Sequence, residues 1–89
     1  MALTLSQAKV LGALHTLGKV ETAGTLALLA GLTSPTARTA LRTLEARGLV
    51  ASSTTMPTFW RITSNGAWII RKPVYREYRD HPRLTNGKA

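Results

Sequence analysis

One stretch of the chain decides the fold, residues 32–50, which reads LTSPTARTALRTLEARGLV. Ser34 is suited to cap a helix, and Pro35 then stands at the first helical position, where its missing N–H costs nothing. We expect this helix to run to about Arg47 and to end at Gly48. Its apolar residues recur at three- and four-residue spacing and should face the core: Ala37, Ala40, Leu41 and Leu44.

The beginning of the chain predicts a first helix over about residues 7–17. Ser6 would cap this helix after the apolar Leu5, and Gly18 is a suitable residue to end it. Residues 19–21 then form a short extended piece, which can supply no more than a single rung of a sheet.

A second helix is expected over residues 23–30, between a cap at Thr22 and a stop at Gly31. Only residues 31–33 separate it from the helix that begins at Ser34. Two helices joined by a tight turn that opens with glycine are typical of a helix-turn-helix.

The residues after the third helix predict a β-hairpin and a short fourth helix. Residues 48–55 have strand composition, a Met-Pro pair interrupts the pattern, and residues 58–63 are β-branched and aromatic. Residues 67–70 then suit a helix that Pro73 should stop. The expected fold class is α+β, mainly α, with a three-helix core, a β-hairpin and a short C-terminal helix.

The composition indicates one small basic domain. The 89 residues carry 12 Lys+Arg against 4 Asp+Glu, a net charge of +8, and 44% of them are hydrophobic, which suits a packed core. The longest apolar run, residues 26–32, is far shorter than the roughly 20 residues that cross a bilayer. The chain has no cysteine for a disulfide or a thiolate-metal site. The positive charge implies a polyanionic partner, namely DNA, RNA or an acidic membrane face.

The charge also divides the chain into a folded unit, residues 1–70, and a basic C-terminal extension, residues 71–89. The extension holds six basic and two acidic residues, and it should act either as a dimerisation segment or as an arm that lies on DNA. In the second case its contacts would be Arg71, Lys72, Arg76 and Arg79. Val74, Tyr75 and Tyr78 form an apolar stripe at helical spacing, and residues 84–89 should be disordered.

The side of the third helix that faces away from the core differs from an ordinary solvent face. At about 100° per residue, Thr39, Arg42 and Ala46 lie opposite the core positions, flanked by Arg38 and Thr43. Small side chains allow close approach to another surface, and arginines can fork onto guanine or phosphate. The net charge and the hairpin favour this reading over an amphipathic helix with two solvated arginines.

Three pieces of the sequence, in this order, resemble the winged helix-turn-helix family, particularly the MarR-like and PadR-like bacterial and archaeal regulators. Residues 3–14 are similar to the family's opening helix, residues 32–50 to its recognition helix and first wing strand, and residues 60–66 (WRITSNG) to its return strand. The resemblance covers residues 3 to about 70. It implies that the third helix lies in the major groove of DNA and that the hairpin, the wing, rests on the neighbouring backbone or minor groove.

The resemblance also implies which residues contact DNA. The positions that match the family's base-reading face are Thr36, Arg38, Thr39 and Arg42. Those that match its phosphate contacts are Thr22, Thr25, Ser34, Thr43 and Arg61. Two features depart from the family's pattern: Thr39 stands where arginine is frequent, and the wing tip, residues 52–58, carries no Lys or Arg.

The sequence supplies no parts for an active site or a metal site. His15 has no second ligand at metal spacing, and the serines and threonines have no matching His and Asp set. We therefore expect no enzyme activity, no cofactor and no metal. The large aromatic residues have a structural explanation instead, with Trp60 and Trp68 filling the small core and Phe59 pointing the other way.

These observations predict a sequence-specific double-stranded DNA-binding protein, a small transcriptional repressor or autoregulator in the cytoplasm, associated with the nucleoid. One protomer covers one half-site, so a homodimer on a near-palindrome is expected, with no membrane partner and no small-molecule effector. Two alternatives stay open. The same fold serves architectural, replication, partition or excision factors, and it serves interaction modules that bind protein or RNA.

Overall fold

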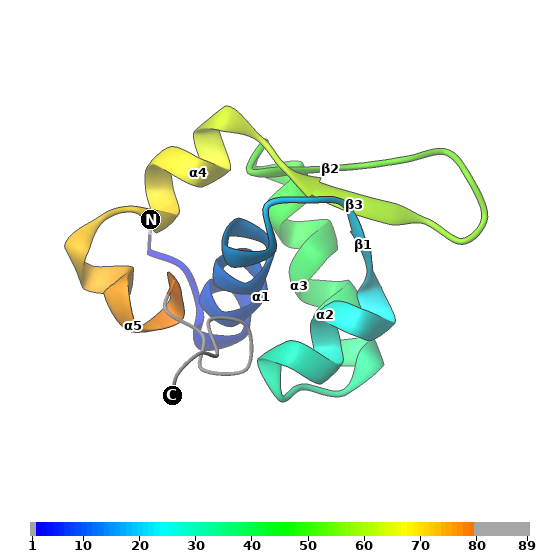
Figure 1. Cartoon of the computed structure of the whole chain (residues 1–89), viewed down its shortest axis with the longest axis horizontal. Helices are drawn as coiled ribbons and strands as arrows, with labels where there is room; N and C mark the ends of the chain where they lie inside the picture. The colour runs from blue at the N-terminus through cyan, green and yellow to red at the C-terminus, as the bar shows by residue number, and fades with distance from the viewer. Residues whose placement is uncertain (1, 80–89) are drawn as a thin grey trace.

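The computed structural model describes residues 2–79, which form a helical body with a small sheet and a projecting hairpin (Figure 1). In chain order the elements are α1 (Leu5–Leu17), β1 (Glu21–Thr22), α2 (Ala23–Ala30), α3 (Ser34–Ala46), β2 (Val50–Ser52), β3 (Phe59–Ile62), α4 (Ser64–Ile70), a 3₁₀ helix η1 (Pro73–Tyr75) and α5 (Arg76–Arg79). The predicted fold class, a three-helix core with a hairpin and a short C-terminal helix, is confirmed. The expectation of disorder over residues 84–89 lies outside the described residues.

The sheet joins the hairpin to the helical body. Its three strands are antiparallel in the order β1-β3-β2, so that Trp60 on β3 lies between Glu21 of β1 and Ser52 of β2. The extended piece predicted before α2 is β1, two residues long. Residues 53–58, between β2 and β3, form the tip of the wing, which projects from the body (Figure 1).

Threonine caps four of the helices. In each case the side-chain oxygen accepts a hydrogen bond from the backbone N–H three residues further on, as N-caps do. The capping residues are Thr4, Thr22, Thr33 and Thr63. The cap predicted at Thr22 is therefore confirmed.

The caps predicted at Ser6 and Ser34 are wrong, because both helices begin earlier. Thr4 forms a reciprocal capping box with Gln7, so two N–H groups that the helix cannot satisfy are paired at once. Thr33 caps α3 and Ser34 is its first residue. Pro35 still lies in the first turn, where its missing N–H leaves no helical bond unmade.

The core lies around α1, which packs against α2, α3, α4 and α5 (Figure 1). The largest fully buried side chains come from α1, α2, α3, β2 and α4: Val10, Leu11, Leu14, Leu26, Leu41, Leu44, Val50 and Ile70. Gly12 lets α5 approach α1 closely, since a Cβ at this position would overlap the Tyr78 carbonyl. The C-terminal part of the described chain therefore packs directly on the central helix.

One aromatic prediction is confirmed and one is wrong. Trp60 is 6% exposed and fills the core, but Trp68 is 66% exposed. The helix that carries Trp68 begins at Ser64, earlier than predicted, and it turns Gly66 and Ile70 to the core instead. Tyr75 occupies the core nearby, and its hydroxyl accepts a hydrogen bond of 3.0 Å from the Leu3 N–H.

The expected apolar stripe after residue 71 does not form as one face. Tyr75 is buried, Tyr78 on α5 is half-buried against the core, and Val74 is 73% exposed. The reason is that residues 73–75 form a 3₁₀ turn before α5, so the three residues do not follow α-helical spacing.

Candidate nucleic-acid interface

The outer face of α3 carries the four residues predicted to read bases. All four are exposed: Thr36, Arg38, Thr39 and Arg42. The predicted core face of the same helix is buried: Ala37, Ala40, Leu41 and Leu44. The predicted division of α3 into a core face and an outer face is therefore confirmed.

Arg38 and Arg42 lie on the wing side of this outer face, and we call this pair the arginine flank. They line a hollow of about 300 Å³. The other lining residues belong to β1, the start of α2, the wing and β3: Thr22, Ala23, Gly24, Met56, Pro57, Thr58 and Trp60. The two guanidinium groups come from residues four apart, one turn of the helix. The flank therefore presents two positive charges beside the wing.

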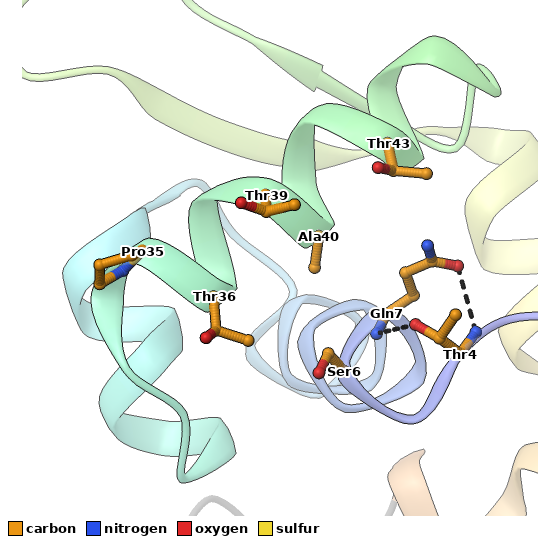
Figure 2. A pocket seen from close by; sticks show the side chains of 8 residues that line it. All are labelled: Thr4, Ser6, Gln7, Pro35, Thr36, Thr39, Ala40 and Thr43. Carbon is orange, nitrogen blue, oxygen red and sulfur yellow. Dashed lines mark hydrogen bonds between the residues drawn. The ribbon is translucent and has the colours of Figure 1, made fainter.

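The opposite side of the outer face is neutral. Thr36, Thr39 and Thr43, the threonine flank, line a groove of about 440 Å³ that α1 borders on its other side (Figure 2). The remaining lining residues are Thr4, Ser6, Gln7, Pro35 and Ala40. None of these eight residues carries a charge. The outer face of α3 thus has a charged flank and a hydroxyl flank.

Hydrogen bonds between threonines prepare two hydroxyls as donors. Thr33 donates to the Thr36 oxygen at 2.8 Å, and Thr22 donates to the Thr25 oxygen at 3.2 Å. Each receiving hydroxyl keeps its own proton, which it can give to another acceptor such as a phosphate oxygen. The Thr22 hydroxyl therefore uses its proton to orient Thr25, and the Thr25 hydroxyl keeps its own proton for a hydrogen bond to another acceptor.

The other predicted phosphate contacts are spread over the surface. Thr43 is exposed on the threonine flank, and Ser34 is half-buried at the start of α3. Arg61 is exposed on β3 and lines neither hollow beside α3.

The polar side chains of the wing tip bond within the wing. The Ser53 hydroxyl oxygen accepts from the Phe59 N–H at 2.9 Å, and the Thr55 hydroxyl donates to the Pro57 carbonyl at 3.1 Å. These bonds hold the tip in the shape that brings Met56 and Pro57 to the hollow beside the arginine flank.

One carboxylate lies on α3 near the arginine flank. Glu45 is exposed, and its carboxylate accepts a hydrogen bond of 2.7 Å from the Ser52 hydroxyl. This bond ties the end of α3 to β2, so the wing and the helix hold a fixed relation at that end. The negative charge of Glu45 acts against any polyanion that approaches the same side.

Three basic residues of the described segment after α4 line neither of the two hollows beside α3. Arg71, Lys72 and Arg76 are exposed, and the Lys72 ammonium lies 4.9 Å from the centre of a Trp68 ring. In Figure 1, α1 separates α5 from α3. The side chain of Arg79 lies outside what the structure describes.

The residues of α1 that border the groove were not predicted. Thr4, Ser6 and Gln7 belong to the first turn of α1 and its cap. The pattern Thr4-x-x-Gln7 is a capping-box signature, and it would have placed the start of α1 correctly. That start is what brings Ser6 beside α3.

Neither a metal-binding cluster nor a membrane-spanning helix occurs among the described residues. Within residues 2–79, no group of three or more His, Cys, Asp or Glu side chains could hold a metal ion. None of the helices in that range is long and apolar enough to cross a bilayer. His15 is half-buried on α1.

The chain matches no known protein-family profile and none of the curated proteins, but its fold resembles solved structures. A MarR-family transcriptional regulator from Silicibacter pomeroyi is 24% identical, with a TM-score of 0.75 over 98% of this chain and 60% of that one. Wild-type ZitR from Lactococcus lactis in complex with DNA is 23% identical, with a TM-score of 0.65 over 93% of this chain and 55% of that one.

Another solved structure, of the MarR-family regulator SPO1453 from Silicibacter pomeroyi, is 19% identical, with a TM-score of 0.67 over 90% of this chain and 54% of that one. The chain thus spans less than two thirds of the length of each of these proteins. Because the identities are low, the likeness shows the fold. The fold of this chain is the winged helix-turn-helix found in MarR-family transcriptional regulators.

Proposed function

We propose that this chain is a sequence-specific double-stranded DNA-binding protein that regulates transcription, with α3 in the major groove and the wing beside it. The outer face of α3 is the observation that carries the proposal. An α-helix fits the major groove, and the small exposed side chains of Thr39 and Ala46 allow it to approach base edges closely. Arg38 and Arg42 can each fork onto a guanine edge or a phosphate.

The charge of the chain supports the same function. A net charge of +8 attracts a polyanion and supplies the counterion-release term that dominates affinity for DNA. The hydroxyls of Thr25 and Thr43 suit phosphate contacts, which set register without reading sequence. Arg61, together with Ser34, would extend these contacts beyond α3.

The solved structures support this function as well, because one of them, ZitR, is described in complex with DNA. A recognition helix of 13 residues reads one half-site, so we infer that two copies bind a near-palindrome. Sedimentation of the protein with and without the duplex tests this dimer.

Selection of bound sites from random duplexes tests the proposal most broadly. We expect a defined preferred site and a steep loss of affinity as salt rises. The substitution Arg42→Ala should weaken binding to the preferred site more than to unrelated duplexes, because a base contact carries sequence preference.

Other outcomes of the same experiment separate the alternatives. An equal loss on all sequences would assign Arg42 to phosphate. Cooperative filling of direct repeats with DNA bending would indicate an architectural factor. Unchanged DNA affinity of both Arg38→Ala and Arg42→Ala would favour a module that binds protein or RNA.

A further inference from the structure

The groove between α1 and α3 adjoins the proposed DNA-reading face but belongs partly to another helix. Thr36, Thr39 and Thr43 form its α3 wall, and the first turn of α1 forms the other (Figure 2). Its volume of about 440 Å³ exceeds that of the hollow at the arginine flank. Any molecule that lies along the threonine flank therefore meets α1 as well.

The chemistry of the groove suits a phosphodiester. Its polar groups are hydroxyls and the amide of Gln7, and no carboxylate among the lining residues repels an anion. The Gln7 amide oxygen already accepts from the Thr4 N–H at 3.2 Å, which leaves the amide N–H groups as donors. In Figure 2 the Ser6 hydroxyl lies on the α1 side of the groove, across from Thr36.

The path of the second DNA strand along the groove follows from the proposed function, on which this inference rests. A helix in the major groove has one DNA strand along each side. The arginine flank and the wing meet one strand, so the other strand must run along the threonine flank and over the first turn of α1.

We propose that the groove between α1 and α3 receives the sugar-phosphate backbone of one strand of the bound duplex, with Ser6 as a phosphate contact. Neutral donors hold this strand, whereas arginines hold the other. The α1 contact thus adds affinity without adding to the salt dependence, because no cation is involved.

The substitution Ser6→Glu tests the proposal, with Val74→Glu as its matched control. Both variants lower the net charge by one, but Val74 is exposed in η1, the turn directly before α5, and α1 lies between α5 and α3 in Figure 1. Ser6 lies in the first turn of α1, which holds no acidic residue. A carboxylate at this position interacts favourably with the helix dipole and stabilises the helix. Ser6→Glu should therefore fold at least as stably as the wild type, which thermal unfolding verifies.

Binding of each variant to the preferred duplex and to an unrelated duplex gives the readout. Ser6→Glu should bind both duplexes at least about fivefold more weakly than Val74→Glu does, the effect of two unit charges roughly 4 Å apart in water. Ser6→Lys should bind both more tightly than Val74→Lys, with a salt slope steeper by about one. The weakening should be equal on both duplexes, since a phosphate contact reads no sequence.

The outcomes separate this inference from the function on which it rests. If the wild type binds no duplex, the proposed function is wrong and the groove assignment falls with it. If the wild type binds and Arg42→Ala weakens it while Ser6→Glu and Val74→Glu bind equally, only the groove assignment is overturned.

Discussion

The two flanks of α3 belong to the same helix and lie on opposite sides of its outer face, and they offer different chemistry. The arginine flank presents two guanidinium groups beside the wing, and the threonine flank presents three hydroxyls beside α1. Arginine contributes charge and a planar fork, and threonine contributes a short neutral donor. The two strands of a duplex would therefore be held by different forces, one sensitive to salt and one not.

This difference shows how a small helix can combine affinity with close approach. Long basic side chains on both sides of α3 would hold the helix away from the base edges. Short hydroxyl side chains on the threonine flank let the backbone of the DNA strand on that side come close to the helix. The wing tip has no Lys or Arg, so the positive charge near α3 rests on Arg38 and Arg42 more than on the loop beside them.

Removal of the arginine flank should give the largest effect. Arg38→Ala with Arg42→Ala should lower affinity for the preferred duplex by about 30-fold to 2 × 10⁴-fold, since each such contact contributes roughly 1–3 kcal/mol. Titration at several salt concentrations checks the result, and the salt slope reports how much of the loss is phosphate contact. Retained affinity and slope would remove the contrast between the flanks.

The cap of α3 supports the threonine flank, because Thr33 bonds to both the Thr36 N–H and the Thr36 hydroxyl. Thr33→Ala should lower the free energy of unfolding by about 0.5–2 kcal/mol. Ser34→Ala, the control one residue further on, should change it by less than about 0.5 kcal/mol. Urea unfolding followed by circular dichroism measures both variants. A larger loss of stability in Ser34→Ala than in Thr33→Ala would show that Ser34, not Thr33, caps the helix.

Loss of one hydroxyl on the threonine flank should have a smaller effect on binding. Thr43→Val keeps the shape of the side chain and removes the hydrogen-bond donor. We therefore expect the free energy of binding to DNA to become less favourable by about 0.5–1.5 kcal/mol. The salt slope should stay the same because no charge is lost. Thr43→Ser, which keeps the hydroxyl, is the control, and a slope that changes with Thr43→Val would show that the flank does not act through neutral donors.

The carboxylate at the end of α3 should weaken binding slightly. Glu45→Gln keeps an oxygen to accept the Ser52 hydrogen bond and removes the negative charge, so affinity for DNA should rise by roughly two- to fivefold. Glu77→Gln makes the same charge change on α5, away from α3, and should have less effect. Equal gains in the two variants would mean that Glu45 acts only through net charge.

The outer face of α3 could be predicted from the sequence because it depends on helical periodicity alone. Four apolar residues at three- and four-residue spacing fix the buried side, and the exposed side follows from it. Gly18, Gly31 and Gly48 likewise have positive φ after a helix, as their positions predict.

The groove between the threonine flank and α1 could not be predicted in the same way. Several threonines and serines near each helix start can serve as caps, and the choice of Thr4 depends on its partner Gln7. Local periodicity also does not report that α1 packs beside α3. Trp68 shows the same limit, because a start of α4 at Ser64 decides which residues face the core.

Chemical protection of a single thiol tests most directly whether the outer face of α3 meets DNA. The chain has no cysteine, so Thr39→Cys and Val74→Cys each place one reactive group at an exposed position, on α3 and near α5 respectively. The account predicts that the preferred duplex slows alkylation of the Thr39→Cys thiol in proportion to the bound fraction, and more than it slows alkylation of the Val74→Cys thiol. Equal alkylation rates for Thr39→Cys with and without saturating duplex would contradict it.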